Sequence, residues 1–214
     1  MTAKYHLIID PDLLAELRDL QARAKTDPNG PAAQQFEAVR RGLSALREGR
    51  EDEFAGERLG RSDNHSDLRD CAEIKIPVVQ EFNRRGRPMG PSHRLTYREF
   101  EGPSESHLPV RQVIAFAPRK DSEIFTQTAI RLGRTRGVAL DELDHLPTVR
   151  PAVGPGKEAD RPIAPPRLPL PPDLTQALKA LEGLPPPTTT TPKATTERRT
   201  TRHQPPSRGP SQSK

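Results

Sequence analysis

Apolar residues recur with helical spacing in two segments near the start of the chain. A short β-type run over residues 5–9 leads into Asp10-Pro11-Asp12, a combination that favours the start of a helix. Leucines then repeat through Lys25, and a turn over 27–31 separates them from a second apolar stripe over Ala32–Arg47 that Gly49 is placed to end. The pattern predicts a strand followed by a helical hairpin, with these apolar positions: Leu13, Leu14, Leu17, Leu20, Phe36, Val39, Leu43 and Leu46.

The period changes to two in the middle of the chain. Ile74 and Ile76 alternate with Glu73 and Lys75, and two further strands are expected over 93–100 and 110–117. The connection 80–92 is rich in arginine, glycine and proline, which is typical of a mobile basic hairpin loop. Ser122-Glu123 opens a last helix that ends near Gly133. The order β-α-α-β-β-β-α predicts a small α+β domain, with an antiparallel sheet packed on the helical hairpin.

Beyond residue 136 the composition changes. Of the 25 prolines in the chain, 16 lie in residues 147–214, and the end of the chain is of low complexity. We therefore expect a domain over 1–136 and a mostly disordered tail over 137–214. Short helices are expected at 138–146 and 173–184, the second with Leu174, Leu178 and Leu181 on one stripe. Each is too short to be stable alone, so it is either transient or docks on a partner or on the domain.

Charge divides in the same way as proline. The whole chain carries a net charge of +5, of which residues 147–214 contribute +6 and residues 1–146 contribute −1. A basic tail attracts nucleic acid or any acidic surface, and the alternative is a solvated linker. Within the domain, residues 74–136 carry 12 Lys and Arg against 6 Asp and Glu.

Several classes of protein are disfavoured by the sequence. The single cysteine, Cys71, excludes an intrachain disulfide, and the first residues lack a charged start followed by an apolar run. We therefore expect no secretory signal and a cytoplasmic location. The longest apolar run in the domain, Val113–Ala117, is too short to span a bilayer. His65, Asp67, Asp70 and Cys71 fit no usual zinc spacing, and no dinucleotide or phosphate-binding glycine motif occurs, so we expect no metal and no cofactor.

Three motifs in the middle of the chain suggest a family. They are Asp70-Cys71-Ala72-Glu73-Ile74-Lys75-Ile76, then His93-Arg94-Leu95-Thr96-Tyr97, then Ala117-Pro118-Arg119-Lys120-Asp121-Ser122-Glu123-Ile124-Phe125. In this order they resemble the RelE branch of the RelE/ParE toxin superfamily, over roughly residues 5–135. The resemblance implies a toxin of a toxin–antitoxin pair, with mRNA, the ribosome and a cognate antitoxin as partners and no membrane.

The resemblance also implies site residues. Ribonuclease members of this family cut mRNA on the ribosome without metal, by attack of a 2′-hydroxyl on the adjacent phosphate. Arg94 and Arg119 match two arginines of the family, and Lys75 matches one of its strand lysines. These three form the expected catalytic set, because their cations suit the charge that builds up on the phosphate. Strand alternation places Lys75 and Arg94 on the solvent face of one sheet. Arg98, Lys120 and Phe125 are the expected RNA-binding residues.

Two positions depart from the family pattern. Glu73 stands where a second lysine is expected, and Phe125 stands where the catalytic tyrosine is expected. A carboxylate at position 73 either serves as the base or repels RNA, and His93 is the other candidate base. Phe125 can stack on a base but cannot transfer a proton, and its place on the apolar stripe of the helix favours a role in the core. Tyr97 is expected to pack in the strand with its hydroxyl in water.

Three functional hypotheses remain from the sequence. The first is a metal-independent endoribonuclease that cleaves mRNA on the ribosome. The second is a toxin that keeps the fold and acts by binding alone, like the branch of the superfamily that poisons DNA gyrase. The third is a non-toxic interaction module. The helix at 173–184 adds one further expectation, that it folds back as a built-in cover over the site, in which case truncation near Arg136 would raise activity.

Overall fold

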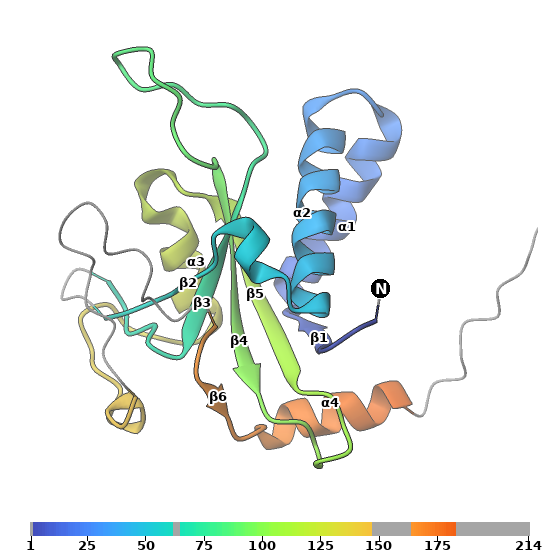
Figure 1. Cartoon of the computed structure of the whole chain (residues 1–214), viewed down its shortest axis with the longest axis vertical. Helices are drawn as coiled ribbons and strands as arrows, with labels where there is room; N and C mark the ends of the chain where they lie inside the picture. The colour runs from blue at the N-terminus through green and yellow to red at the C-terminus, as the bar shows by residue number, and fades with distance from the viewer. Residues whose placement is uncertain (1, 62–64, 147–163, 183–214) are drawn as a thin grey trace, which may run out of the picture.

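The strands and helices come from a computed structural model, which describes residues 2–61, 65–146 and 164–182. Strand β1 leads into two long helices, α1 and α2, and three central strands, β3 to β5, precede helix α3 (Figure 1). The bounds are β1 His6–Ile9, α1 Pro11–Thr26, α2 Pro31–Glu48, β2 Glu57–Arg58, β3 Cys71–Ile76, β4 His93–Phe100, β5 Val110–Pro118, α3 Glu123–Arg131, β6 Arg167–Leu168 and α4 Pro172–Glu182.

The helices begin and end where their capping residues predict. The carboxylate of Asp10 accepts hydrogen bonds from the backbone N–H groups of Asp12, at 3.1 Å, and Leu13, at 3.4 Å. Gly49 ends α2 with a φ of 66°, a left-handed conformation that costs glycine little. The hairpin of α1 and α2 is therefore set by local chemistry as well as by its apolar stripe.

The sheet has the order β1-β5-β4-β3-β2, with β6 paired to the far end of β4. The expectation of an antiparallel sheet is wrong at two places, because β1 runs parallel to β5 and β6 runs parallel to β4. The sheet is mixed because β1 joins the outer edge of β5, a strand distant in sequence, and parallel neighbours need such long crossover connections. Strand β2 is only two residues long, which is too short to show an alternation of apolar and polar residues in the sequence.

The two faces of the sheet are covered by different helices. One face packs on α1 and α2 in the main core, which includes Leu13, Leu46, Ile74, Leu95 and Tyr97. On the other face α3 covers Ile114, Ala115 and Ala117. A register shift between β4 and β5 at Thr96 and Tyr97 places the consecutive residues Ile114 and Ala115 against this second core. A residue of β3 or β4 that points away from the main core therefore points toward the α3 side.

The segment beyond residue 136 contributes to the fold. Within 138–146 only Asp141–Leu143 is helical, as a single 3-10 turn. Helix α4 packs its Leu174 and Leu178 on Phe100 and Val110, at the end of the sheet drawn lowest in Figure 1. The helix expected at 173–184 is thus docked on the domain, and its last two residues lie outside the described residues. The expected disorder of the Thr-rich and Pro/Ser/Arg-rich end also concerns residues outside them.

No helix in the described ranges has the length and apolar character that a membrane crossing requires.

Candidate functional site

The register of the sheet brings the three expected catalytic cations to one end of it. Lys75 of β3 lies directly opposite Arg94 of β4, and Arg94 lies opposite Ala117 of β5. Arg119 follows two residues beyond Ala117 and donates its backbone N–H to Ser92, just before β4, at 2.9 Å. Lys75 and Arg94 thus lie on two adjacent strands, and Arg119 directly follows the end of the third. We refer to these three residues as the cation row.

Each member of the cation row is paired with a carboxylate. Lys75 Nζ lies 3.1 Å from Glu57, and Arg119 Nη2 lies 3.5 Å from Glu81. Arg94 Nε donates to Glu73 at 3.1 Å. No sequence pattern marks Glu57 or Glu81, which come from a two-residue strand and from a loop. The site is therefore a row of alternating charges rather than a purely basic patch.

The Arg94 side chain is less exposed than expected for a residue on the solvent face of the sheet. Its side chain is only 12 % exposed, and its Nη1 donates to the carbonyls of Pro91, at 2.7 Å, and His93, at 2.9 Å. Its Nη2 makes no hydrogen bond to any residue that the structure describes. Arg94 is held rigidly by its neighbours and keeps two N–H donors for a further acceptor.

Glu73 is the most unusual residue of this group. Its side chain is buried, and while Oε1 accepts from Arg94, Oε2 has no hydrogen-bond partner in the described part of the chain. Burial raises the pKa of Glu73 above its ordinary value, although the charges of Arg94 and Lys75 oppose this rise. A carboxyl group with a raised pKa and an unused oxygen beside two cations has the properties of a proton acceptor.

Arg119 is the most available arginine of the cation row. Its guanidinium makes one long contact, to Glu81, and its side chain is 24 % exposed. Lys120 follows it and is exposed, without an ion pair in the described part of the chain. The chain then turns through Asp121 and Ser122, whose φ angles of 55° and 59° are left-handed and costly for residues other than glycine. This strained turn fixes where β5 ends and where Arg119 and Lys120 project.

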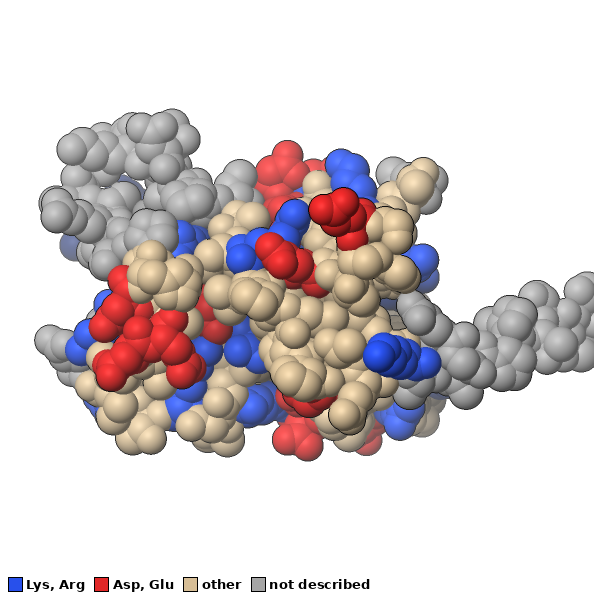
Figure 2. Space-filling model, turned by 90° about the horizontal axis from the view of Figure 1, so that it is seen from below, with Lys and Arg blue, Asp and Glu red and all other residues tan. Residues whose placement is uncertain are grey.

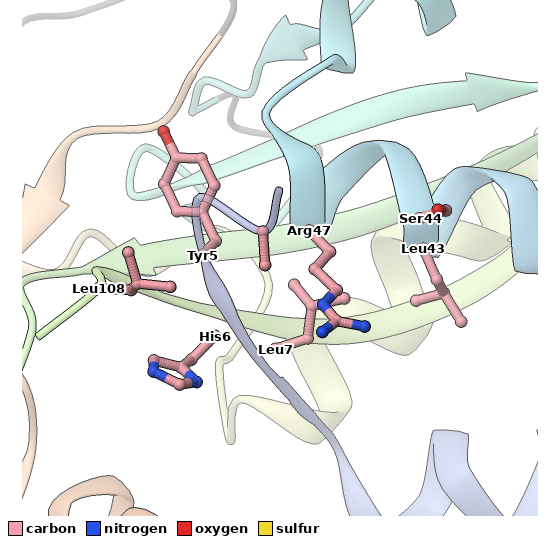
Figure 3. A pocket seen from close by; sticks show the side chains of 8 residues that line it. Tyr5, His6, Leu7, Leu43, Ser44, Arg47 and Leu108 are labelled. Carbon is pink, nitrogen blue, oxygen red and sulfur yellow. The ribbon is translucent and has the colours of Figure 1, made fainter. Parts of the chain in front are cut away.

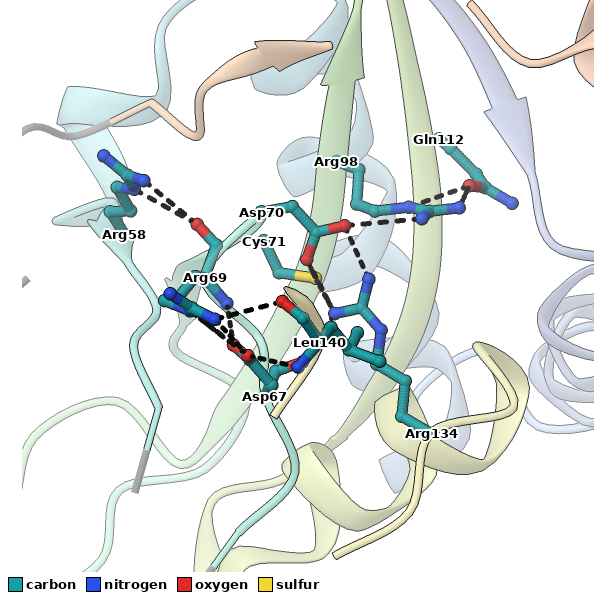
Figure 4. A network of polar contacts seen from close by, with 9 residues as sticks. All are labelled: Arg58, Asp67, Arg69, Asp70, Cys71, Arg98, Gln112, Arg134 and Leu140. Atoms are coloured by element: carbon teal, nitrogen blue, oxygen red, sulfur yellow. Dashed lines mark hydrogen bonds and ion pairs between the residues drawn. The ribbon is translucent and has the colours of Figure 1, made fainter. Parts of the chain in front are cut away.

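Arg98 lies on the same face of β4 but belongs to another cluster (Figure 4). It donates to Gln112 at 2.7 Å and contacts Asp70 at 3.4 Å. Arg134 holds the same Asp70 with two hydrogen bonds of 2.6 Å. Burial would raise the pKa of Asp70, but Arg134 outweighs it, and the pKa is lowered. The structure does not bring Arg98 into the cation row.

Phe125 and His93 also lie apart from the cation row. Phe125 packs on the second core, with the ring of His65 edge-on at 6.0 Å. His93 stacks on Phe116 of the main core, at 5.3 Å between ring centres, so it lies on the α1–α2 side of the sheet. Of the two candidate bases, only Glu73 shares a face with Arg94.

The expectation for Tyr97 is wrong. The Tyr97 hydroxyl, expected in water, is buried because the ring is enclosed by the main core, and it has no hydrogen-bond partner among the described residues. Burial raises the pKa of Tyr97. Cys71 is buried, and burial raises the pKa of its thiol as well. Within the described ranges no three His, Cys, Asp or Glu side chains gather where they could hold a metal ion.

The cation row lies outside three pockets on the surface. A pocket of about 480 Å³ between β1 and α2 is lined by Tyr5, His6, Leu43 and Arg47 among others (Figure 3). A second, of about 380 Å³, lies beside Phe125. A third, of about 180 Å³, lies between α1 and α3. None of the three is lined by the cation row.

Charge at the opposite end of the molecule is mixed. Figure 2 views the end that carries α4, and there Lys and Arg residues are interspersed with Asp and Glu residues.

Searches of protein-family models, of curated proteins and of solved structures find no match to this chain.

Proposed function

We propose that this chain is a RelE-like toxin that cleaves mRNA on the ribosome in the cytoplasm, without metal or cofactor, and that a cognate antitoxin controls it. The observation that carries the proposal is the cation row, in which Lys75 and Arg94 are register partners and Arg119 directly follows the next strand. A buried carboxyl group, Glu73, lies beside two of these cations. This arrangement offers phosphate-binding donors and a proton acceptor on one face of one sheet.

The proposed reaction has three requirements, and each has a candidate residue. Glu73 takes the proton of the attacking 2′-hydroxyl once the side chains over its unused oxygen, which is buried, move aside. Arg119 and the free Nη2 of Arg94 stabilise the charge that develops on the phosphate oxygens. Lys75 assists the departing 5′-oxygen as a cation or proton donor. The products are a 2′,3′-cyclic phosphate and a 5′-hydroxyl end, so the P–O5′ bond breaks as the P–O2′ bond forms.

The carboxylates that pair with the cation row have a role in this scheme. Glu81 holds Arg119 by a single contact of 3.5 Å, which a phosphate with two oxygen acceptors can replace. Arg94 does not need to release Glu73, because its Nη2 has no hydrogen bond to the described part of the chain. Binding of RNA therefore breaks one weak ion pair and leaves the buried one intact.

Mapping of 5′ ends in cellular mRNA after brief expression tests the proposal. The wild type is compared with Arg119→Ala and with Arg41→Ala, a control that removes an exposed arginine from α2. We expect new 5′ ends within coding regions, lost in Arg119→Ala and kept in the control. Intact mRNA in the wild type would refute the nuclease, and new ends that persist in Arg119→Ala would remove Arg119 from the site.

A second candidate function is binding without catalysis, either as a gyrase poison or as a non-toxic module. The observation in its favour is that all three cations are already paired with carboxylates, and that Phe125 replaces a proton-transferring tyrosine and packs in a core. Growth arrest with DNA damage and intact mRNA would support the gyrase-poison form. Harmless expression without an antitoxin would support the interaction module.

A further inference from the structure

The connection between β3 and β4 forms a finger that projects beyond the sheet (Figure 1). We define the finger as residues 79–90. Phe82 pairs with Pro88 across it, and Met89 donates its N–H to the carbonyl of Glu81 at 2.7 Å. The composition of residues 80–92 predicts a mobile loop, whereas the finger has a hydrogen-bonded stem.

The tip of the finger is built around Asn83. Its side-chain oxygen accepts from the backbone N–H groups of Arg85, at 2.9 Å, and Arg87, at 3.0 Å. Gly86 donates to the carbonyl of Asn83 at 2.9 Å and has a φ of 70°, which favours glycine at this point. The backbone of the tip is therefore fixed, and three arginine side chains, those of Arg84, Arg85 and Arg87, project from it.

These three arginines differ from the other cations discussed above. All three are exposed, and none has an ion pair with another residue that the structure describes. The finger also carries exposed apolar side chains, with Phe82 61 % exposed and Val79 49 % exposed. A solvated loop has no need of a large exposed aromatic ring beside three unpaired guanidinium groups.

We propose that the finger binds single-stranded RNA, with its arginines on phosphates and Phe82 stacked on a base. Arginine suits phosphate because its planar fork matches the phosphate oxygens, and an exposed aromatic ring beside such cations suits unpaired bases. A membrane is a poorer fit, because the apolar side chains lie on the stem and the tip that would enter the lipid is polar.

The finger leads directly to the cation row. Glu81 of the finger holds Arg119, and a Cβ placed on Gly90 would lie 3.9 Å from Arg119 Nη1. RNA bound along the finger would reach Arg119 without leaving the protein surface. This part of the inference rests on the proposed function, whereas RNA binding by the finger does not.

The test is fluorescence anisotropy with a short single-stranded RNA whose 2′-hydroxyls are methylated, so that it cannot be cleaved. The full chain is compared with the triple variant Arg84→Ala/Arg85→Ala/Arg87→Ala. The control is Arg18→Ala/Lys25→Ala/Arg41→Ala, which removes the same charge from exposed positions on α1 and α2. Three lost phosphate contacts predict an affinity roughly tenfold to a hundredfold lower, and a salt-dependence slope smaller by about 2.

Two more variants separate the parts of the finger. Phe82→Ala should weaken binding by about fivefold or more with little change in the salt slope, because stacking is not a charge effect. Asn83→Ala keeps every charge but releases the tip, so a moderate loss of affinity is expected from the lost preorganisation.

Several outcomes would overturn the inference. Equal losses in the triple variant and the control would mean that net charge alone binds RNA. Binding of duplex DNA as tight as that of the RNA would overturn the single-strand assignment. If the triple variant lost binding to phosphatidylserine vesicles but kept its binding to RNA, the finger would be assigned to a membrane. The probe cannot be cleaved, so a chain without nuclease activity can still support the finger. Conversely, Arg119-dependent cleavage with normal RNA affinity in the triple variant would refute the finger alone.

Discussion

Replacement of Glu73 by glutamine should make the protein more stable while it removes activity. The raised pKa of Glu73 means that burial disfavours its charge by more than Arg94 and Lys75 favour it. Glutamine has the shape of the protonated side chain and needs no desolvation of a charge. At neutral pH we therefore expect Glu73→Gln to raise the free energy of unfolding, by about 1 kcal/mol, the usual scale of one buried polar interaction.

The pH dependence of this gain gives a second check on its cause. The folded protein binds the Glu73 proton more tightly than the unfolded chain does, so wild-type stability increases as pH falls through the raised pKa toward the ordinary value of 4.5. The glutamine variant has no such proton. The stability difference should be largest at neutral pH and should vanish below the ordinary glutamate pKa.

Glu99→Gln is the matched control. Glu99 is as buried as Glu73, but one of its oxygens accepts from Arg111, at 3.1 Å, and the other from Arg167, at 2.7 Å. Loss of a charge that is fully paired should cost about 3 kcal/mol. Urea unfolding at neutral and acidic pH measures both variants. If Glu73→Gln destabilised the chain as Glu99→Gln does, the argument that Glu73 is retained for chemistry would be refuted. Cleavage should fall by about 10²-fold or more in Glu73→Gln if it is the base.

Two further predictions concern the network around Asp70. Arg134→Met should lower the free energy of unfolding by about 3 kcal/mol, seen as a lower urea midpoint with an unchanged slope, because Asp70 is left buried with the weaker contacts of Arg98 and the Cys71 thiol. Because the pKa of Asp70 is lowered in the folded protein, the contribution of Asp70 to the free energy of unfolding is complete above the ordinary aspartate pKa and is lost as pH falls through the folded pKa. The free energy of unfolding of Asp70→Asn should therefore fall less steeply with acidification than that of the wild type.

The sequence predicted the parts of this fold that depend on local chemistry. The leucine spacing and the caps at Asp10 and Gly49 are near-neighbour effects, and both long helices lie where they indicated. The pairing of β1 with β5 joins residues far apart in the chain, and alternation within a strand carries no information about its neighbours. Alternation also predicts on which face of the sheet Lys75 and Arg94 lie. It cannot predict that Glu57 and Glu81, which come from other segments, form ion pairs with the cation row.

The position of α4 argues against its proposed role as a cover over the site. It lies on Phe100 and Val110, at the end of the sheet away from the cation row (Figure 1). A chain truncated after residue 146 exposes both side chains, and each buried apolar side chain of this size is worth about 1.5–3 kcal/mol. We therefore expect the truncated chain to have a lower urea midpoint and no gain in activity. A truncated chain of unchanged stability and higher activity would show instead that the segment acts as an inhibitor.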